Sequence, residues 1–138
     1  MYRIVIHGGA GLSTPQDLGE DREKIARLAL RESLLAANDI LANQGTALDA
    51  VQVAVQIMED SEVFNAGKGS VFASDGVQRM DASIMDGKTM KAGALCGVST
   101  IRYPIKAACL IMEKTPHVML YGKDAEQLAT EHGLEIVD

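Results

Sequence analysis

Apolar residues recur every three or four positions between residues 21 and 41, which is the spacing of one face of an α-helix. Asp21 and Glu23 stand at the start of this segment, where acidic side chains interact favourably with the helix dipole. Gly45 follows the segment and provides a stop signal. The pattern therefore predicts a helix whose buried stripe consists of Ala26, Leu30, Leu34, Ala37 and Leu41.

A second helix is predicted from Ala47 to about Glu59. Thr46, with Asp49 three positions later, fits the side-chain pattern that caps a helix N-terminus. The helix is apolar on nearly all sides, so we expect neighbouring parts to cover most of it; its apolar residues include Leu48, Val51, Val53, Val55 and Ile57. The Gly45–Thr46 bond is also of the type at which some hydrolases cut themselves, but its place between two helices favours a structural role.

Shorter apolar segments predict strands and turns. The first is Arg3–His7, which we interpret as a buried strand. Small apolar residues in the later segments are typical of a sheet that is packed on both faces. These segments are a hairpin over 71–80 around Ser74-Asp75-Gly76, strands over 82–85 and 92–99 with a turn at Asp86-Gly87, and an extended piece over 118–121.

Two more helices are predicted in the last third of the chain. Pro104 precedes a helix over 105–114. Asp124 is expected to cap a helix that runs to about His132 and ends at Gly133, and residues 134–138 are expected to be extended. Two leading helices, several antiparallel strands and two final helices indicate an α+β fold in a single unit, residues 1–138, with no internal domain boundary.

Composition and charge narrow the range of functions. Among 138 residues, 13 are Lys or Arg and 19 are Asp or Glu, which gives a formal net charge of −6 and argues against a basic nucleic-acid-binding protein. No apolar run approaches the ~20 residues needed to cross a bilayer, and the start of the chain lacks the pattern of a signal peptide, so we expect a cytoplasmic protein that binds no membrane. Cys96 and Cys109 form neither a disulfide framework nor a metal-binding spacing.

Two glycine-containing loops are the strongest candidates for chemistry. The first, His7-Gly8-Gly9-Ala10-Gly11, follows a predicted strand, and its glycines allow backbone N–H groups to approach a ligand oxygen. It has neither the dinucleotide-binding spacing nor the Lys-Ser/Thr ending of a phosphate loop, and a simple tight turn is an equally good interpretation. His7 alone has no identifiable partner, so we interpret it as a packed histidine.

The second loop is Phe64-Asn65-Ala66-Gly67-Lys68-Gly69-Ser70. Its two glycines permit sharp reversals that turn carbonyl oxygens inward, and such hard oxygen ligands suit an alkali or alkaline-earth cation. Asn65 offers both a hydrogen-bond donor and an acceptor. From the residues alone, a purely structural loop is the favoured interpretation.

Other reactive side chains are given structural interpretations. Asp81 and Asp86 are expected to act in turns or caps, because no spacing argument brings the two carboxylates together. Cys96 is expected to be a buried, inert thiol. Lys88 and Lys91 are expected to be solvated charges of a hairpin. The residues therefore provide no convincing nucleophile.

Four segments, taken together and in order, resemble the plant-type L-asparaginase / isoaspartyl aminopeptidase family of N-terminal nucleophile hydrolases. They are IVIHGGAG at 4–11, FNAGKGSV at 64–71, MDASIMDG at 80–87 and LIMEKTPH at 110–117. The resemblance implies a four-layer αββα sandwich made from one precursor that cleaves itself before a threonine. This chain resembles the N-terminal α-subunit half, and the β subunit from the same precursor would complete an (αβ)₂ assembly. The linker that usually precedes the cut in the family has no counterpart up to Asp138.

The resemblance also implies an activity. The N-terminal threonine of the β subunit would attack the side-chain carbonyl of L-asparagine or of a β-aspartyl (isoaspartyl) dipeptide, with its own α-amino group as the base. The nucleophile, the oxyanion donors and the groups that hold the substrate would lie on the β subunit. No catalytic residue is therefore expected in this chain, and no organic cofactor.

Three supporting residues and one ion site carry over to this chain by position in the family motifs. Asn65 matches an asparagine beside the nucleophile, and Gly8 and Gly9 match the glycine loop near the cleavage site, which matters for self-processing. Residues 111–118 match a loop that binds K⁺ in some members, and we do not assign that ion here. Residues 58–68 match a structural Na⁺ site built from the main-chain oxygens of Met58, Glu59, Ser61, Phe64, Ala66 and Lys68.

The sequence also departs from the family and leaves alternatives open. Cys109 stands where the family usually has an arginine, whose loss would weaken a salt bridge at an interface or on the helix surface unless a partner compensates. The missing targeting signal favours the asparaginase and isoaspartyl peptidase branch over a glycosylasparaginase-like or threonine-aspartase-like member. A non-enzymatic fragment that acts as a binding module is the other alternative.

Overall fold

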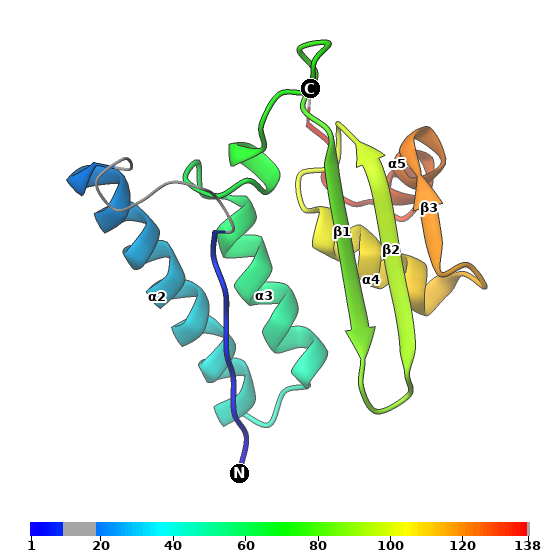
Figure 1. The fold of residues 1–138 in the computed structure, drawn as a ribbon. Helices are drawn as coiled ribbons and strands as arrows, with labels where there is room; N and C mark the ends of the chain where they lie inside the picture. Colours follow the sequence, from blue (N-terminus) through cyan, green and yellow to red (C-terminus); the bar gives the residue numbers. More distant parts are fainter. Residues whose placement is uncertain (10–18, 138) are drawn as a thin grey trace. The chain divides into compact units, whose positions relative to one another are not determined.

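The computed structural model describes residues 1–9 and 19–137. The chain divides into two compact units, Met1–Gly69 and Ser70–Asp138, and each is described by itself (Figure 1). The prediction of one unit without an internal boundary stays a prediction. None of the helices in the described part of the chain combines the length and the apolar composition needed to cross a membrane.

The first unit is built on two helices, α2 (Glu20–Ala42) and α3 (Ala47–Glu59), followed by a single 3₁₀ turn, η1 (Gly67–Gly69). Both predicted helices are confirmed. The side chains that α2 buries are the small ones, Ala29, Ser33 and Ala37, whereas Leu34 of the predicted stripe is 38% exposed. The buried stripe is displaced because small residues allow the two helices to approach closely. Ala37 forms a common cluster with Ala50 and Ala54 of α3.

The N-terminus of α3 confirms the predicted capping box. The Thr46 hydroxyl accepts a hydrogen bond from the Asp49 N–H at 3.1 Å, and the Asp49 carboxylate accepts one from the Thr46 N–H at 3.2 Å. Thr46 therefore acts as a helix cap. The expectation that α3 is covered on most sides is wrong for this unit, because Val51 is 40% exposed and α3 buries only Ala50, Ala54 and Glu59.

The N-terminal segment runs alongside these two helices (Figure 1). Ile4 and Ile6 pack against the alanine cluster, whereas Val5 between them is 90% exposed. This alternation is that of an extended chain with one face buried. The prediction of a strand over Arg3–His7 is nevertheless wrong here, since no strand includes these residues in the described part of the chain. A strand requires a neighbouring strand to pair with its backbone.

The second unit contains a three-stranded sheet with the order β1-β2-β3. The strands β1 (Met80–Asp86) and β2 (Lys91–Val98) form an antiparallel hairpin, and β3 (Met119–Tyr121) pairs with β2 in parallel. These three predicted segments are confirmed as strands. The predicted hairpin over 71–80 is reduced to a tight turn, in which the Ala73 N–H donates to the Val77 carbonyl, and to a single bridge between Phe72 and Gln78.

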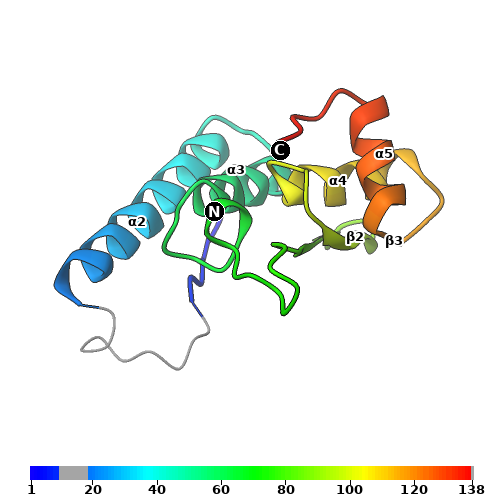
Figure 2. The same cartoon turned by 90° about the horizontal axis from the view of Figure 1, so that it is seen from above.

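Two helices, α4 (Pro104–Lys114) and α5 (Gly122–Glu131), lie on the same face of this sheet (Figure 2). Gly93 allows α4 to approach β2 closely, since a Cβ atom there would lie 2.6 Å from the Met112 nitrogen. The core of this unit consists of Met80, Leu95, Val98, Ile101, Ala107, Ile111, Ala125 and Ala129.

The opposite face of the sheet is open. Met85, Met119 and Tyr121 are 53%, 55% and 67% exposed, and Asp81 and Ser83 of β1 are exposed as well. The expectation of a sheet packed on both faces is therefore not met by the described residues. One face is buried by the unit's own helices, and the other is exposed in the described part of the chain.

The ends of α5 differ in how well they were predicted. Asp124 is not the N-cap, because the helix begins at Gly122 and places Asp124 in the first turn. Gly122 adopts a φ of 51°, which allows the chain to pass directly from β3 into α5. Gly133, with a φ of 71°, follows the helix end as predicted. The extended segment after it forms one bridge, between Ile101 and Ile136.

Candidate functional site

The loop after α3 is the best-defined candidate site. It covers residues 58–69 and is called the carbonyl loop below. The last turn of α3 leads into it, where the Asp60 N–H donates to the Gln56 carbonyl and the Ser61 N–H donates to the Met58 carbonyl. Carbonyl groups at a helix C-terminus lack partners within the helix and are therefore free to serve as ligands.

Two glycines show how tightly the carbonyl loop is folded. A Cβ atom at Gly69 would collide with the Phe64 carbonyl oxygen and lie 2.8 Å from the Ser61 carbonyl oxygen. At Gly67, which has a φ of 51°, a Cβ atom would collide with the Glu59 carbonyl oxygen. The loop therefore turns at least three main-chain oxygens toward its own glycines.

Those three oxygens belong to the six positions predicted to hold Na⁺. Of the others, the Ala66 carbonyl accepts a hydrogen bond from the Gly69 N–H at 3.1 Å, and the Met58 carbonyl accepts the bond from Ser61. Each of these carbonyls keeps a second lone pair. Among the residues that the structure describes, no group of three or more His, Cys, Asp or Glu side chains could hold a metal, so a cation here would depend on the main chain. Main-chain oxygens of this kind are hard ligands that suit an alkali or alkaline-earth cation.

Charged side chains surround the carbonyl loop. The Glu59 side chain is 3% exposed at the end of α3. Lys68 turns its ammonium group to the Glu62 carboxylate at 2.6 Å. The hydrogen bond from Lys68, together with its charge, lowers the pKa of the Glu62 carboxyl. Both partners of this ion pair are well exposed, so it adds little to stability.

Asn65 lies at the outer edge of the carbonyl loop. Its neighbour Phe64 is buried, with 7% of its surface exposed, whereas Asn65 is exposed. The buried ring fixes the backbone, and the next side chain is presented at the surface. An amide in this position can both donate and accept hydrogen bonds to a partner that approaches the loop.

Gly8 of the glycine loop lies directly against Phe64 of the carbonyl loop. A Cβ atom at Gly8 would lie 2.5 Å from Leu30 Cδ2 and 2.8 Å from Phe64 Cε1. Gly9 has a φ of 99° and open space where its side chain would be. His7 is exposed, so its interpretation as a packed histidine is wrong. Ala10 and Gly11 lie outside the described residues. The structure thus brings together two loops that the sequence could only name separately.

The predicted turn role is confirmed for Asp86, whereas Asp81 lies within strand β1 and is neither a turn nor a cap residue. Asp86 accepts hydrogen bonds from the Thr89 hydroxyl at 2.6 Å and the Lys88 N–H at 3.0 Å, which lower its pKa and fix the turn. Asp81 accepts a hydrogen bond from the Gly97 N–H at 2.8 Å, next to the register irregularity between β1 and β2.

The cysteines are not arranged for nucleophilic chemistry. The Cys96 thiol is half-buried, and a hydrogen bond with the Asp81 carboxylate raises its pKa, which keeps it protonated. Cys109 is buried in α4, 5% exposed, so in this unit it does not lie on a helix surface, where a lost salt bridge was one expectation.

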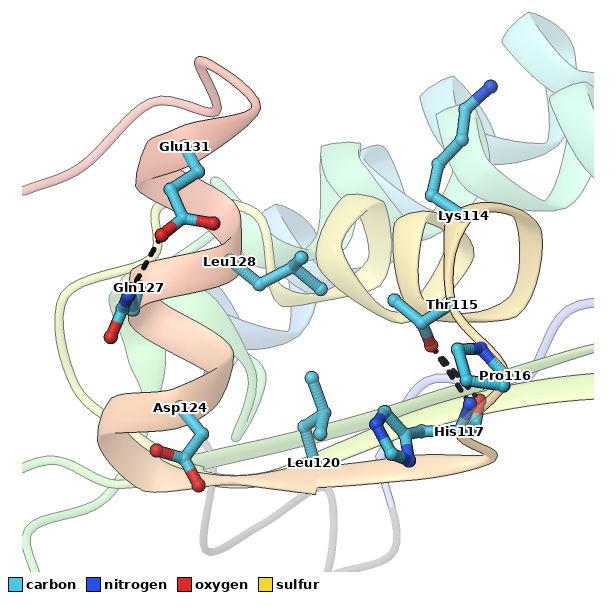
Figure 3. A pocket seen from close by; sticks show the side chains of 9 residues that line it. All are labelled: Lys114, Thr115, Pro116, His117, Leu120, Asp124, Gln127, Leu128 and Glu131. Carbon is cyan, nitrogen blue, oxygen red and sulfur yellow. Dashed lines mark hydrogen bonds between the residues drawn. The ribbon is translucent and has the colours of Figure 1, made fainter.

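A pocket of about 460 Å³ in the second unit was not predicted (Figure 3). Figure 3 shows Asp124 and Glu131 projecting from α5, with Lys114, Thr115 and His117 across from them. The Thr115 hydroxyl shapes the loop by donating to the Ile111 carbonyl at 2.9 Å and accepting from the His117 N–H at 3.1 Å. The pocket includes part of the 111–118 segment, but the sequence carried no signal that these side chains line a pocket.

Known proteins resemble this chain over nearly its whole length. A family model described as Asparaginase matches residues 1–138. A relative from Dictyostelium discoideum, provisionally named isoaspartyl peptidase/L-asparaginase, is 50% identical over 98% of this chain and 39% of its own length. The isoaspartyl peptidase of Salmonella typhimurium is 42% identical over 95% of the chain and 42% of its own length. The plant-type L-asparaginase of Pyrococcus abyssi is 42% identical over 100% of the chain and 44% of its own length.

The chain therefore spans about two fifths of the length of the curated relatives that it matches. The match is continuous, and it includes both the glycine loop and the carbonyl loop. With every residue matched by the family model and nearly the whole chain shared with these relatives, residues 1–138 belong to the asparaginase family of isoaspartyl peptidases and plant-type L-asparaginases.

Proposed function

We propose that residues 1–138 are the α-subunit part of an amidohydrolase that acts on L-asparagine and β-aspartyl dipeptides. One observation carries the proposal. The chain is matched almost completely by relatives that are named isoaspartyl peptidase or plant-type L-asparaginase, yet it spans only 39% to 44% of their length. The remaining part of such an enzyme would supply the residues that this chain does not provide.

The proposed mechanism places the nucleophile on a β subunit made from the same precursor. Its N-terminal threonine would attack the side-chain carbonyl carbon of the substrate, and its own α-amino group would take up the hydroxyl proton. Ammonia or the peptide amine would leave, and water would then release aspartate from the enzyme. Asn65 would stand beside the threonine and orient it, which agrees with the exposed position of this side chain.

The carbonyl loop would hold a structural Na⁺ through the main-chain oxygens of Met58, Glu59, Ser61, Phe64, Ala66 and Lys68. The Glu59 oxygen beside Gly67, and the Ser61 and Phe64 oxygens beside Gly69, support this assignment. When bound, the ion would neutralise the partial negative charges of these carbonyls and stabilise the loop. The buried Phe64 would fix the backbone that presents Asn65.

Partner binding is supported by the surfaces that the two units leave open. The face of the sheet with Met85, Met119 and Tyr121 is exposed, and Val5 is exposed in an extended segment that pairs with no strand of the described chain. We propose that the β subunit covers such surfaces, in a four-layer αββα sandwich that assembles as (αβ)₂. Gly8 and Gly9 would lie near the self-cleavage site. The cytoplasmic location of the protein stays a prediction.

Hydrolysis by the complete polypeptide that contains residues 1–138 tests the activity. Aspartate release is measured with L-asparagine, a β-aspartyl dipeptide and a glycosylated asparagine. The proposal predicts release from the first two and little from the third. Release from glycosylated asparagine alone would favour a glycosylasparaginase-like enzyme. No release from any of the three, by a folded protein, would favour a binding module.

A further inference from the structure

Phe64 contacts the two candidate loops with two different parts of the same residue. Its carbonyl oxygen lies beside Gly69 in the carbonyl loop, and its ring edge fills the space beside Gly8. The residue is 7% exposed, so the ring is held in place by its surroundings. A shift of the Phe64 backbone would therefore move the ring, and with it the wall against which Gly8 packs.

The fit at Gly8 is close enough to transmit such a shift. A Cβ atom there would lie 2.8 Å from Phe64 Cε1 and 3.2 Å from Cζ, and separations below 3.0 Å do not occur for real Cβ atoms. Leu30 Cδ2, on the other side, is the end of a flexible side chain and can move aside. Packed interiors transmit strain because they contain little free volume. The ring of Phe64 is thus the stiffer of the two contacts.

We propose that Phe64 is a positioning residue that couples cation binding in the carbonyl loop to the conformation of the glycine loop. Na⁺ held by the main-chain oxygens would fix the Phe64 backbone. Its ring would then restrict the positions open to Gly8 and Gly9. The inference rests on the proposed cation role of the carbonyl loop and adds a route by which that ion would control self-processing at a distance.

Hydrogen exchange in the complete polypeptide tests this coupling without any substrate. Exchange is followed for peptides that contain Gly8 and Gly9 and for peptides of the carbonyl loop, in NaCl and in choline chloride at equal ionic strength. With Na⁺ at about ten times its dissociation constant, exchange through openings that release the ion slows about tenfold. We expect this slowing in both loops. Slowing in the carbonyl loop alone, or in neither loop, would overturn the proposal.

The Phe64→Leu variant separates coupling from ion binding. It keeps the carbonyl oxygen and removes the ring edge that touches Gly8. We expect Na⁺ to slow exchange in the carbonyl loop as before, and to change exchange at Gly8 and Gly9 by less than about twofold. An unchanged effect at Gly8 and Gly9 in this variant would show that the ring is not the link.

A pair of glycine substitutions supplies the matched control. Gly8→Ala should speed exchange in the carbonyl loop about tenfold, because the new methyl group pushes on the ring, and Phe64→Leu in the same chain should restore most of it. Gly9→Ala creates backbone strain at a φ of 99° with no neighbour within 4 Å. Any change in hydrogen exchange that it causes should therefore remain when Phe64→Leu is added. Equal rescue of both, or of neither, would contradict the contact. Hydrolysis is measured separately from hydrogen exchange. A protein whose two loops are coupled but which hydrolyses no substrate would contradict the proposed function and leave the coupling intact.

Discussion

At the scale of single residues, the carbonyl loop owes its shape to positions where only glycine fits. Gly67 needs a left-handed backbone, and Gly69 needs the absence of a side chain. The sequence revealed two glycines between Phe64 and Ser70, which suggested inward carbonyls. The glycine spacing alone could not show which carbonyls turn toward the glycines, because that depends on where the end of α3 lies relative to the loop, and the candidate positions came from the family resemblance.

Gly69→Ala tests the close packing of this loop. The added methyl group would meet the Phe64 and Ser61 carbonyl oxygens, so the free energy of unfolding should fall by about 1–3 kcal/mol, the usual cost of overpacking. Gly87→Ala is the matched control, since nothing lies within 4 Å of its Cβ position, and it should change stability by less than about 0.5 kcal/mol. Urea unfolding of both variants makes the comparison. Equal effects would mean that the loop is not as tight as described.

Asn65→Ala tests the proposed role of the exposed amide. The variant should fold normally and lose about 10- to 100-fold in kcat, because small errors in the placement of a nucleophile are costly. Glu62→Gln, on the same loop, removes only an exposed ion pair and should leave kcat within about twofold. Steady-state kinetics with a β-aspartyl dipeptide provides the measurement. An Asn65→Ala enzyme with full activity would remove this residue from the site.

Asp75 gives a prediction about pH in the turn at residues 73–77. Hydrogen bonds from Arg79 and the Val77 N–H lower the pKa of Asp75 from 3.8 to about 2. The folded pKa is below the unfolded one, so the ionised carboxylate stabilises the turn above pH 3.8, and this contribution disappears as the pH falls through about 2. NMR titration should give a midpoint near pH 2 for Asp75. Arg79→Gln should move that midpoint upward, and a midpoint near 3.8 in the parent protein would contradict the ion pair.

At the scale of elements, local signals in the sequence predicted several helices and strands and where they begin and end. The helix α3 begins and ends where its cap and its apolar residues indicated, and the turn at Asp86 joins two strands as expected. The two failures have different causes. The segment Arg3–His7 has the alternation of a strand, but pairing depends on a neighbouring chain, and Asp124 was displaced from the cap by Gly122, which allows an earlier start.

The cap of α3 can be tested directly. Thr46→Ala removes the oxygen that accepts from the Asp49 N–H, and it should lower the free energy of unfolding by about 1 kcal/mol. Thr46→Ser keeps that oxygen and should be close to neutral. Thermal or urea unfolding distinguishes the two variants. If Thr46→Ser abolished hydrolysis while leaving stability intact, Thr46 would have a chemical role that the capping geometry does not provide.

At the scale of the whole molecule, the sequence motifs indicated the family, and the structure shows which surfaces the chain's own residues leave uncovered. The small apolar residues of β1 and β2 predicted a sheet covered on both faces, yet only one face is buried by α4 and α5. A sequence pattern reports that a face is apolar enough to be covered, and it does not report which chain covers it. The pocket near Thr115 escaped prediction for a related reason, because its walls come from separate elements.

The central claim is that these residues are one subunit of a self-cleaved enzyme. Its most direct test is the intact mass, under denaturing conditions, of the purified complete polypeptide that contains residues 1–138, with N-terminal sequencing of each chain found. The account predicts two chains, one that contains residues 1–138 and a second that begins with threonine. A single uncleaved chain, or a second chain that begins with another residue, would contradict it.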